Sequence, residues 1–295
     1  RLWLAMALNG EGSPEASARQ ARGFEVGDHV GGGAPGELPL RDISDRLGIR
    51  RSGLVGALSF LDVNNDGWPD LFVSGVGGDR LFRNSAEGRF EDVTELAGVG
   101  GEVDGWSTCS AFFDADNDGD LDLFVGHYVQ WSPNIDFEQG TTLTGIGRAY
   151  GQPMNFQGTF PSLYQNQGDG TFKDVSGECG IQVKNSATEV PVAKSLGVAP
   201  VDLNGDGLMD LIVANDTVQN FVFINQGGMV FKEVGARTGI GFDSFGKARG
   251  AMGIDTARFR EDKAMGGGIA NFANEMTALY VGRSENLIFT DEAIP

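Results

Sequence analysis

Three short segments of the chain carry acidic and amide side chains at one shared spacing. Each has Asp at the first, fifth and ninth positions, Asp or Asn at the third, and Gly at the sixth. Calcium takes hard oxygen ligands, and the first, third and fifth side chains with the seventh carbonyl of such a loop surround one ion. The sequence therefore predicts about three calcium sites, with these ligands: Asp62, Asn64, Asp66, Trp68, Asp70, Asp114, Asp116, Asp118, Asp120, Asp122, Asp202, Asn204, Asp206, Leu208 and Asp210.

These loops differ from those of EF-hand proteins. An EF-hand supplies a bidentate Glu at the twelfth position, whereas Val73, Val125 and Val213 stand there. The ninth-position Asp replaces that ligand, and an apolar strand follows instead of a helix. An ordinary polar turn would explain one such cluster, but three copies in register favour a metal-binding function.

A fourth copy of the loop has lost this chemistry. Arg258, Arg260, Asp262, Lys263 and Gly266 stand where the other loops carry Asp, Asp or Asn, Asp, Gly and Asp. A guanidinium group has only hydrogen-bond donors and cannot bind a cation. We expect this loop to lack a metal, with an arginine supplying the positive charge.

Composition narrows the possible functions. The 295 residues include 41 Asp and Glu against 22 Lys and Arg, a net charge of -19, which would repel nucleic-acid phosphates and anionic lipids. Two histidines and two cysteines leave little for zinc sites or a disulfide framework. A bridge between Cys109 and Cys179 is left open. No stretch is long and apolar enough for a membrane-spanning helix.

The elements that must position the loops repeat along the chain. An apolar strand enters each loop and another leaves it, for example Asp70-Leu-Phe-Val. A strand ending in Asn follows, with Phe six residues later in a Phe-x-Asp-Val-Thr type strand and turn, as in Phe82-Arg-Asn and Phe90-Glu-Asp-Val-Thr. The unit recurs about every 55 residues once an insertion of about 30 is set aside, and four strands per unit predict β-propeller blades. We expect an all-β fold with about four repeats, in an open or larger propeller.

Two boundaries follow from this repeat. Residues 1–36 form a linker, or the remnant of a preceding segment, and end in a Gly- and Pro-rich stretch. Their apolar start fits either a trimmed signal peptide or the tail of a helix from another domain. Residues 37–295 hold the repeats, beginning with an extra outer strand at 40–44 for which no partner blade is visible.

The insertion at about residues 129–161 is the expected place for specificity. Trp131, Tyr150 and Phe156 lie there among Gly, Pro, Asn and Gln. Aromatic rings with amides suit a sugar or a peptide, and loops on a rigid scaffold often bind ligands. Packing of these rings onto the propeller is an equally good interpretation. For His127 and Tyr128 we expect packing at the rim.

These residues resemble a known family. The repeats are similar to FG-GAP/VCBS repeat propellers, and Phe245-Gly-Lys-Ala-Arg-Gly-Ala comes close to the motif that names them. The acidic loops with Phe-x-Asp-Val-Thr/Ser resemble bacterial relatives of the cartilage acidic protein, often joined to an ASPIC/UnbV module. This resemblance implies secretion or exposure at the cell surface, calcium-stabilised blades and a role in binding or adhesion.

Two functions follow as hypotheses. The first is a non-enzymatic, calcium-stabilised binding or adhesion module, extracellular or periplasmic, whose partner is a protein or carbohydrate. The second is the propeller scaffold of a secreted hydrolase or lyase acting on polysaccharide. No catalytic Ser/His/Asp order, zinc motif or phosphate-binding loop is visible, so the first is preferred.

Overall fold

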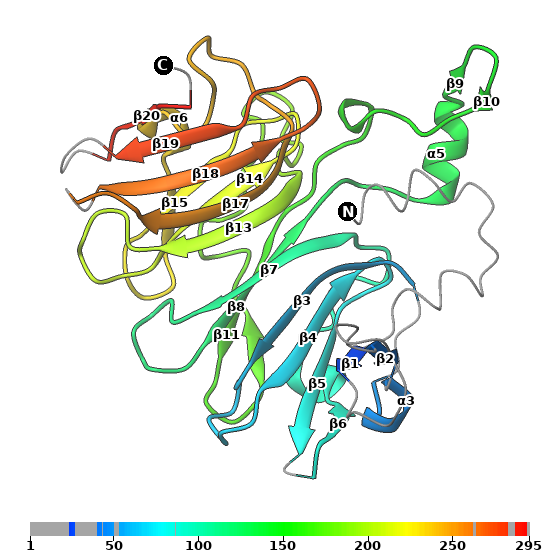
Figure 1. Ribbon diagram of the computed structural model, residues 1–295, viewed down its shortest axis with the longest axis vertical. Coiled ribbons are helices and arrows are strands. Elements are labelled where there is room, and N and C mark those ends of the chain that lie inside the picture. The colour runs from blue at the N-terminus through cyan, green and yellow to red at the C-terminus, as the bar shows by residue number, and fades with distance from the viewer. Residues whose placement is uncertain are drawn as a thin grey trace, which may run out of the picture.

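The computed structural model shows an almost entirely β structure (Figure 1). It describes residues 24–26, 40–42, 44–49, 53–85, 87–261, 264–282 and 287–293. These described residues contain four four-stranded antiparallel sheets. The sheets follow one another along the chain and fan out in space, so that each packs against the next (Figure 1).

Each sheet is one β-propeller blade, with its strands in chain order from the innermost to the outermost. The first contains β3 (Val55–Leu61), β4 (Asp70–Gly75), β5 (Arg80–Ser85) and β6 (Arg89–Asp92). The second contains β7 (Ser107–Phe113), β8 (Asp122–His127), β11 (Ser162–Asn166) and β12 (Phe172–Asp174). The third contains β13 (Ser195–Val201), β14 (Asp210–Asn215), β15 (Phe221–Asn225) and β16 (Phe231–Glu233). The fourth contains β17 (Ala251–Arg258), β18 (Met265–Asn271), β19 (Ala278–Gly282) and β20 (Phe289–Asp291).

The remaining elements are short. β1 (Phe24–Val26) lies inside the segment interpreted as a linker and pairs with β2 (Leu40–Asp42) in a two-stranded sheet. One-turn helices follow three outer strands, where the sequence predicted turns: α3 (Ser44–Leu47), α4 (Thr94–Ala97) and α6 (Gly235–Thr238). The insertion contains α5 (Pro133–Gln139), β9 (Thr142–Leu143), β10 (Gly147–Arg148) and the 3-10 turn η1 (Pro153–Asn155).

Burial follows the position of each strand in its blade. The second strands β4 and β14 are buried at every residue, because both faces of the sheet are covered by apolar side chains. The innermost strands β7 and β13 alternate between buried and half-buried residues. The apolar runs and alternating segments of the sequence are thus explained by two-sided packing between blades.

The core lies between the blades and not within one of them. Between the first and second blades, the rings of Phe72 and Phe112 meet edge to face with centroids 5.8 Å apart. Between the second and third, Phe113 and Phe231 pack in the same way at 6.3 Å. Edge-to-face packing favours such aromatic pairs beyond the burial of their area. The predicted fold class, a β-propeller of four-stranded blades with about four repeats, is confirmed.

The cysteines left open by the sequence are both free and buried. Cys109 lies in β7, and burial raises the pKa of its thiol to about 12. Burial also raises the pKa of Cys179. Both thiols therefore stay protonated and unreactive near neutral pH.

Candidate metal centre

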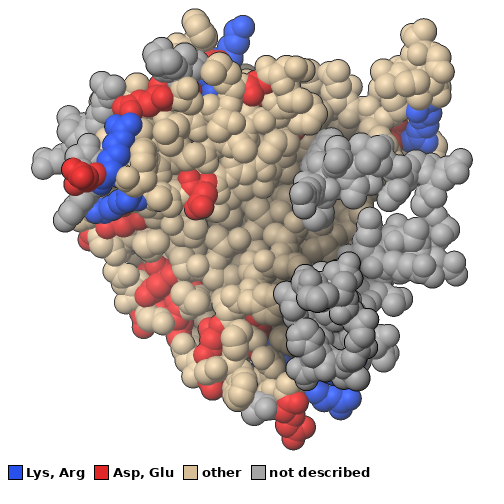
Figure 2. Space-filling model, in the orientation of Figure 1, with Lys and Arg blue, Asp and Glu red and all other residues tan. Residues whose placement is uncertain are grey.

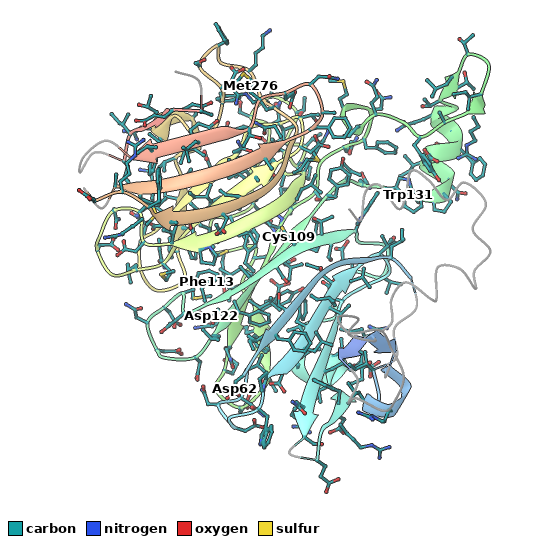
Figure 3. All side chains as sticks on the ribbon, viewed as in Figure 1. Asp62, Cys109, Phe113, Asp122, Trp131 and Met276 are labelled. Carbon is teal, nitrogen blue, oxygen red and sulfur yellow. The ribbon has the colours of Figure 1, made fainter. Side chains whose placement is uncertain are left out.

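The three acidic loops join the first strand of a blade to the second, at the same end of the first three blades. Asp62 and Asp122 mark two of them in Figure 3. Side chains link neighbouring loops: Asn65 Nδ2 donates to Asp120 Oδ1 at 2.8 Å, and Asn117 Nδ2 donates to the Gly207 carbonyl at 3.4 Å. Figure 2 shows acidic side chains along this edge with few basic ones among them. The packing of the blades therefore brings the predicted sites together.

The first Asp of each loop closes the turn. One carboxylate oxygen of Asp62, Asp114 and Asp202 accepts the N–H of the loop glycine at 2.7, 3.0 and 3.1 Å. These glycines, Gly67, Gly119 and Gly207, have φ of 88, 95 and 86°, a left-handed conformation that glycine adopts at little cost. The glycine at the sixth position thus permits the sharp turn of the loop.

The ninth-position Asp tethers the backbone. Asp122 is almost fully buried, and its Oδ2 accepts the N–H of Ala115 while its Oδ1 accepts that of Asn166, both at 2.8 Å. Asp70 and Asp210 repeat this arrangement in the first and third blades. Burial raises the pKa of Asp122 and of Asp210 to about 6 and also raises that of Asp70, and neighbouring loop carboxylates add to the effect.

The second loop is the one in which carboxylates converge. Asp114, Asp116 and Asp122 each place an oxygen within 4.8 Å of the others. Gln165 Nε2 donates to Asp116 Oδ2 at 2.7 Å, but the buried Asp116 Oδ1 has no hydrogen-bond partner. A buried, unpaired carboxylate oxygen among other carboxylates is unfavourable without a cation. Hard oxygen donors in this arrangement fit calcium.

The first and third loops are arranged differently, because an amide stands at their third position. Asn64 Nδ2 donates to Asp66 Oδ2 at 2.9 Å, and Asn204 Nδ2 donates to Asp206 Oδ2 at 2.8 Å. In the second loop Asp116 stands at the third position, and an ionised carboxylate there has no hydrogen to donate to the fifth-position Asp. The fifth-position carboxylates of all three loops accept the backbone N–H of Trp68, Asp120 or Leu208 at 2.9 Å. The role of those three carbonyls as metal ligands stays a prediction.

The fourth loop has the register that the sequence predicted. Ala257 pairs with Gly266, just as Val201 pairs with Asp210, so Arg258 follows at the position of Asp202. Arg260 forms an ion pair with Glu292. Asp262 and Lys263 lie outside the described residues. The expected lack of metal in this loop stays a prediction.

Sequence reasoning did not identify the function of the Asn that lies at or next to the end of the third strand in the first three blades. Asn166 Nδ2 donates to the carbonyl of Leu121 in its own loop and to that of Val63 in the preceding loop, both at 3.1 Å. Asn225 makes the same pair of bonds to Met209 and Ala115. These amides connect each blade to the previous loop. The recurrence of Asn at one position of the repeat was the sequence signal that could have revealed this function.

At the other end of the strands, His127 lies in a chain of polar side chains. Its Nδ1 is 3.1 Å from Ser107 Oγ, its Nε2 is 3.1 Å from Ser162 Oγ, and Ser107 Oγ donates to Asp79 Oδ2 at 3.1 Å. Burial lowers the pKa of His127 to about 4. A group with this pKa is a weak base near neutral pH. The surroundings of His127 therefore fit the packing role that the sequence predicted for it.

This burial predicts a pH effect on stability. Unfolded His titrates near ~6.5, so between about pH 6.5 and pH 4 the unfolded state binds a proton that the folded state rejects. The contribution of His127 to the free energy of unfolding should fall by about 2 kcal/mol from pH 7 to pH 5. Urea unfolding of the wild type and of His127→Gln at both pH values measures this contribution. The carboxylates contribute equally to the pH dependence of both proteins, so their contribution cancels when the two free energies of unfolding are subtracted. Equal pH dependence in both would contradict it.

The aromatic residues of the insertion divide into two groups. Trp131 packs edge to face on Trp106 at 5.8 Å, and Phe156 is buried beside Tyr128. Tyr150 is exposed. Packing is therefore the role of two of the three predicted residues. Further exposed apolar side chains lie near Tyr150 in the sequence: Phe137, Leu143, Ile146 and Met154. Arg148 Cζ lies 3.6 Å from the ring centroid of Phe137.

Comparison with protein families agrees with the loops and strands. A model of the FG-GAP-like repeat matches residues 62–125 and 202–265. Two segments of this chain are thus similar to the FG-GAP-like repeat. Each match begins at the first Asp of an acidic loop and ends in the second strand of the following blade. The narrower likeness to relatives of the cartilage acidic protein remains a resemblance. A search of curated proteins gave no match.

Among solved structures, this chain is similar to a lectin from Agrocybe aegerita, described as recognising non-reducing terminal N-acetylglucosamine. The two are 17% identical, with a TM-score of 0.42, and the alignment covers 79% of this chain and 50% of the lectin. This chain thus matches about half of the lectin's length. None of the described helices has the length and apolar character of a membrane span.

Proposed function

We propose that this chain is a calcium-stabilised binding module without catalytic activity. The observation that carries the proposal is the second acidic loop, where three carboxylates converge and Asp116 Oδ1 is buried without a hydrogen-bond partner. Two further loops with the same turn support it. Bound calcium would balance the negative charge of these converging carboxylates. Asp114, Asp116, Asp118 and Asp122 would hold it in the second loop, with the corresponding residues in the other two.

The expected setting is extracellular, at the cell surface or periplasmic. Extracellular calcium modules often bind with dissociation constants of about 10⁻⁴ to 10⁻³ M, so such loops would be largely empty at cytosolic calcium levels. The net charge of -19 would repel nucleic acids and anionic lipids, which disfavours both as binding partners. This setting is an inference from calcium supply.

The proposed partner is a protein or a carbohydrate that meets the insertion. α5 and the β9–β10 hairpin project from the body of the molecule (Figure 1). Tyr150 and its exposed apolar neighbours lie on this projecting segment, while Trp131 and Phe156 fix its base. Exposed aromatic and aliphatic side chains on a firmly packed base are suited to binding. Recognition would then use a different part of the chain from the calcium loops.

The test of calcium stabilisation is Asp118→Ala. Its carboxylate lies on the exposed side of the second loop, where Oδ1 accepts one backbone N–H at 2.9 Å. In saturating calcium the variant should lose the contribution of one site, about 2.7 kcal/mol at a hundredfold excess over the dissociation constant. In excess chelator the loss should be below about 1 kcal/mol, because one exposed hydrogen bond contributes little.

Thermal unfolding with calcium and with chelator, alongside calorimetric titration of chelator-stripped protein, makes this measurement. Asp169→Ala is the matched control, since Asp169 lies in an exposed turn of the same blade outside the acidic loops. Equal destabilisation by Asp118→Ala in both conditions would show that the loop is only a turn.

A further inference from the structure

β1 and β2 have the strand register of the outer half of a blade. In all four blades an aromatic residue of the third strand pairs with an acidic residue of the fourth. Phe24 of β1 pairs with Asp42 of β2 in the same way. The equivalent pairs are Phe82 with Asp92, Tyr164 with Asp174, Phe223 with Glu233, and Tyr280 with Asp291. β1 and β2 therefore correspond to third and fourth strands.

The residues after β2 occupy the matching position on the first blade. A Cβ on Gly48 would lie 2.7 Å from the Phe90 carbonyl, and one on Gly98 would lie 3.2 Å from that of Phe172 in the second blade. The same approach recurs in the next two blades, at 2.3 Å for Gly180 and 2.6 Å for Gly239. Ile49 also packs against the core residues Leu71, Val73 and Phe82. α3 and Ile49 thus cover the outer part of the first blade, as a preceding blade would.

None of the residues that the structure describes covers the inner part of that same face. Leu58 and Phe60 on β3 are 60% and 65% exposed. By strand pairing they are equivalent to Ser110 and Phe112 on β7. There, Ser110 Oγ lies 3.0 Å from Ser59 Oγ and Phe112 packs on Phe72, so both contact the preceding blade. Leu58 and Phe60 therefore lie where a preceding blade would place its two inner strands.

We propose that an apolar β-hairpin of the same repeat type binds here. Its two strands would complete the half blade formed by β1 and β2. In the described part of the chain β1 pairs only with β2, whereas each complete blade joins its third strand to a second. Backbone pairing along β1 would give register, and burial of Leu58 and Phe60 would give affinity. We identify the occupant from the three existing interfaces between blades, because in each of them the inner strands of one blade pack on those of the next.

The probe is a cyclic peptide containing residues 195–215, the inner strand pair of the third blade. Ser195 and Asn215 are cross-strand partners, so an Asn-Gly linker can close the ring and hold the hairpin. Binding to the full chain is followed by calorimetry in saturating calcium and by the fluorescence of a Phe60→Trp variant. We expect binding with a blue shift of the new tryptophan, and at least tenfold weaker binding to Phe60→Asp.

Phe245→Asp is the control on the chain, because Phe245 is 84% exposed in the connection between α6 and β17. The control peptide carries Ile212→Asp, which replaces the equivalent of Phe72 on the side that would meet Phe60. The absence of binding by the wild-type chain would overturn the proposal. Binding that is unchanged in Phe60→Asp would also overturn it, since the peptide would then lie elsewhere.

Discussion

Replacing Asp122 with alanine is expected to lower the free energy of unfolding by about 3 to 5 kcal/mol even in excess chelator. Asp122 accepts the backbone N–H groups of Ala115 and Asn166, both at 2.8 Å, in a buried position. Alanine would leave both donors without a partner. This loss is independent of metal, unlike the loss expected for Asp118→Ala. Urea denaturation with and without calcium separates the two contributions.

Asp122→Asn is the matched control. The amide retains one acceptor oxygen, so it can satisfy one of the two backbone donors, and the loss should be about half as large. Calcium dependence of the second site should still weaken in both variants, because both remove a carboxylate from the convergent group. Equal stability of wild type and Asp122→Ala in chelator would contradict the tethering role assigned to this carboxylate.

The second large effect is expected for Gly180→Ala, at about 3 kcal/mol. Gly180 has φ of 88°, and its added Cβ would lie 2.3 Å from the Phe231 carbonyl of the next blade. The Phe231 N–H donates to the Cys179 carbonyl at 2.7 Å, which holds the two backbones together. A side chain here would push the second and third blades apart.

Gly170→Ala separates backbone strain from this clash. Gly170 has φ of 84° in the same blade, but nothing lies within 4 Å of an added Cβ. Its loss should be about 1 kcal/mol, the cost of a left-handed alanine. Denaturation of both variants under the same conditions gives the comparison. Similar losses in the two would mean that the contact between blades contributes little.

The strand order and the acidic loops were predictable because their causes are local in the chain. Turn formation by Asp62 and Gly67 depends on residues five apart, and the burial of β4 follows from its own apolar run. The bounds of the insertion, between β8 and β11, were also predicted from the break in the repeat. Local periodicity and turn chemistry are what a sequence displays directly.

The half blade formed by β1 and β2 was harder to predict from the sequence. The sequence predicted an extra strand at 40–44 without a partner blade, and the structure pairs β2 with β1 inside the segment interpreted as a linker. That segment is rich in Gly and Pro, which hid a strand of only three residues. Its identity as a third strand came from register with Asp42, which requires the tertiary structure.

The sequence by itself determined the repeat, the four-stranded blades and the candidate calcium ligands, because each depends on spacing within a few residues. Only the tertiary structure decided which ligands converge, that Asn166 ties its blade to Val63 across 103 positions of the chain, and that the surroundings of His127 lower its pKa. It also decided that Trp131 and Phe156 pack while Phe60 is exposed. These outcomes depend on which blade faces meet, and contacts between residues distant in the chain arise only when the blades pack.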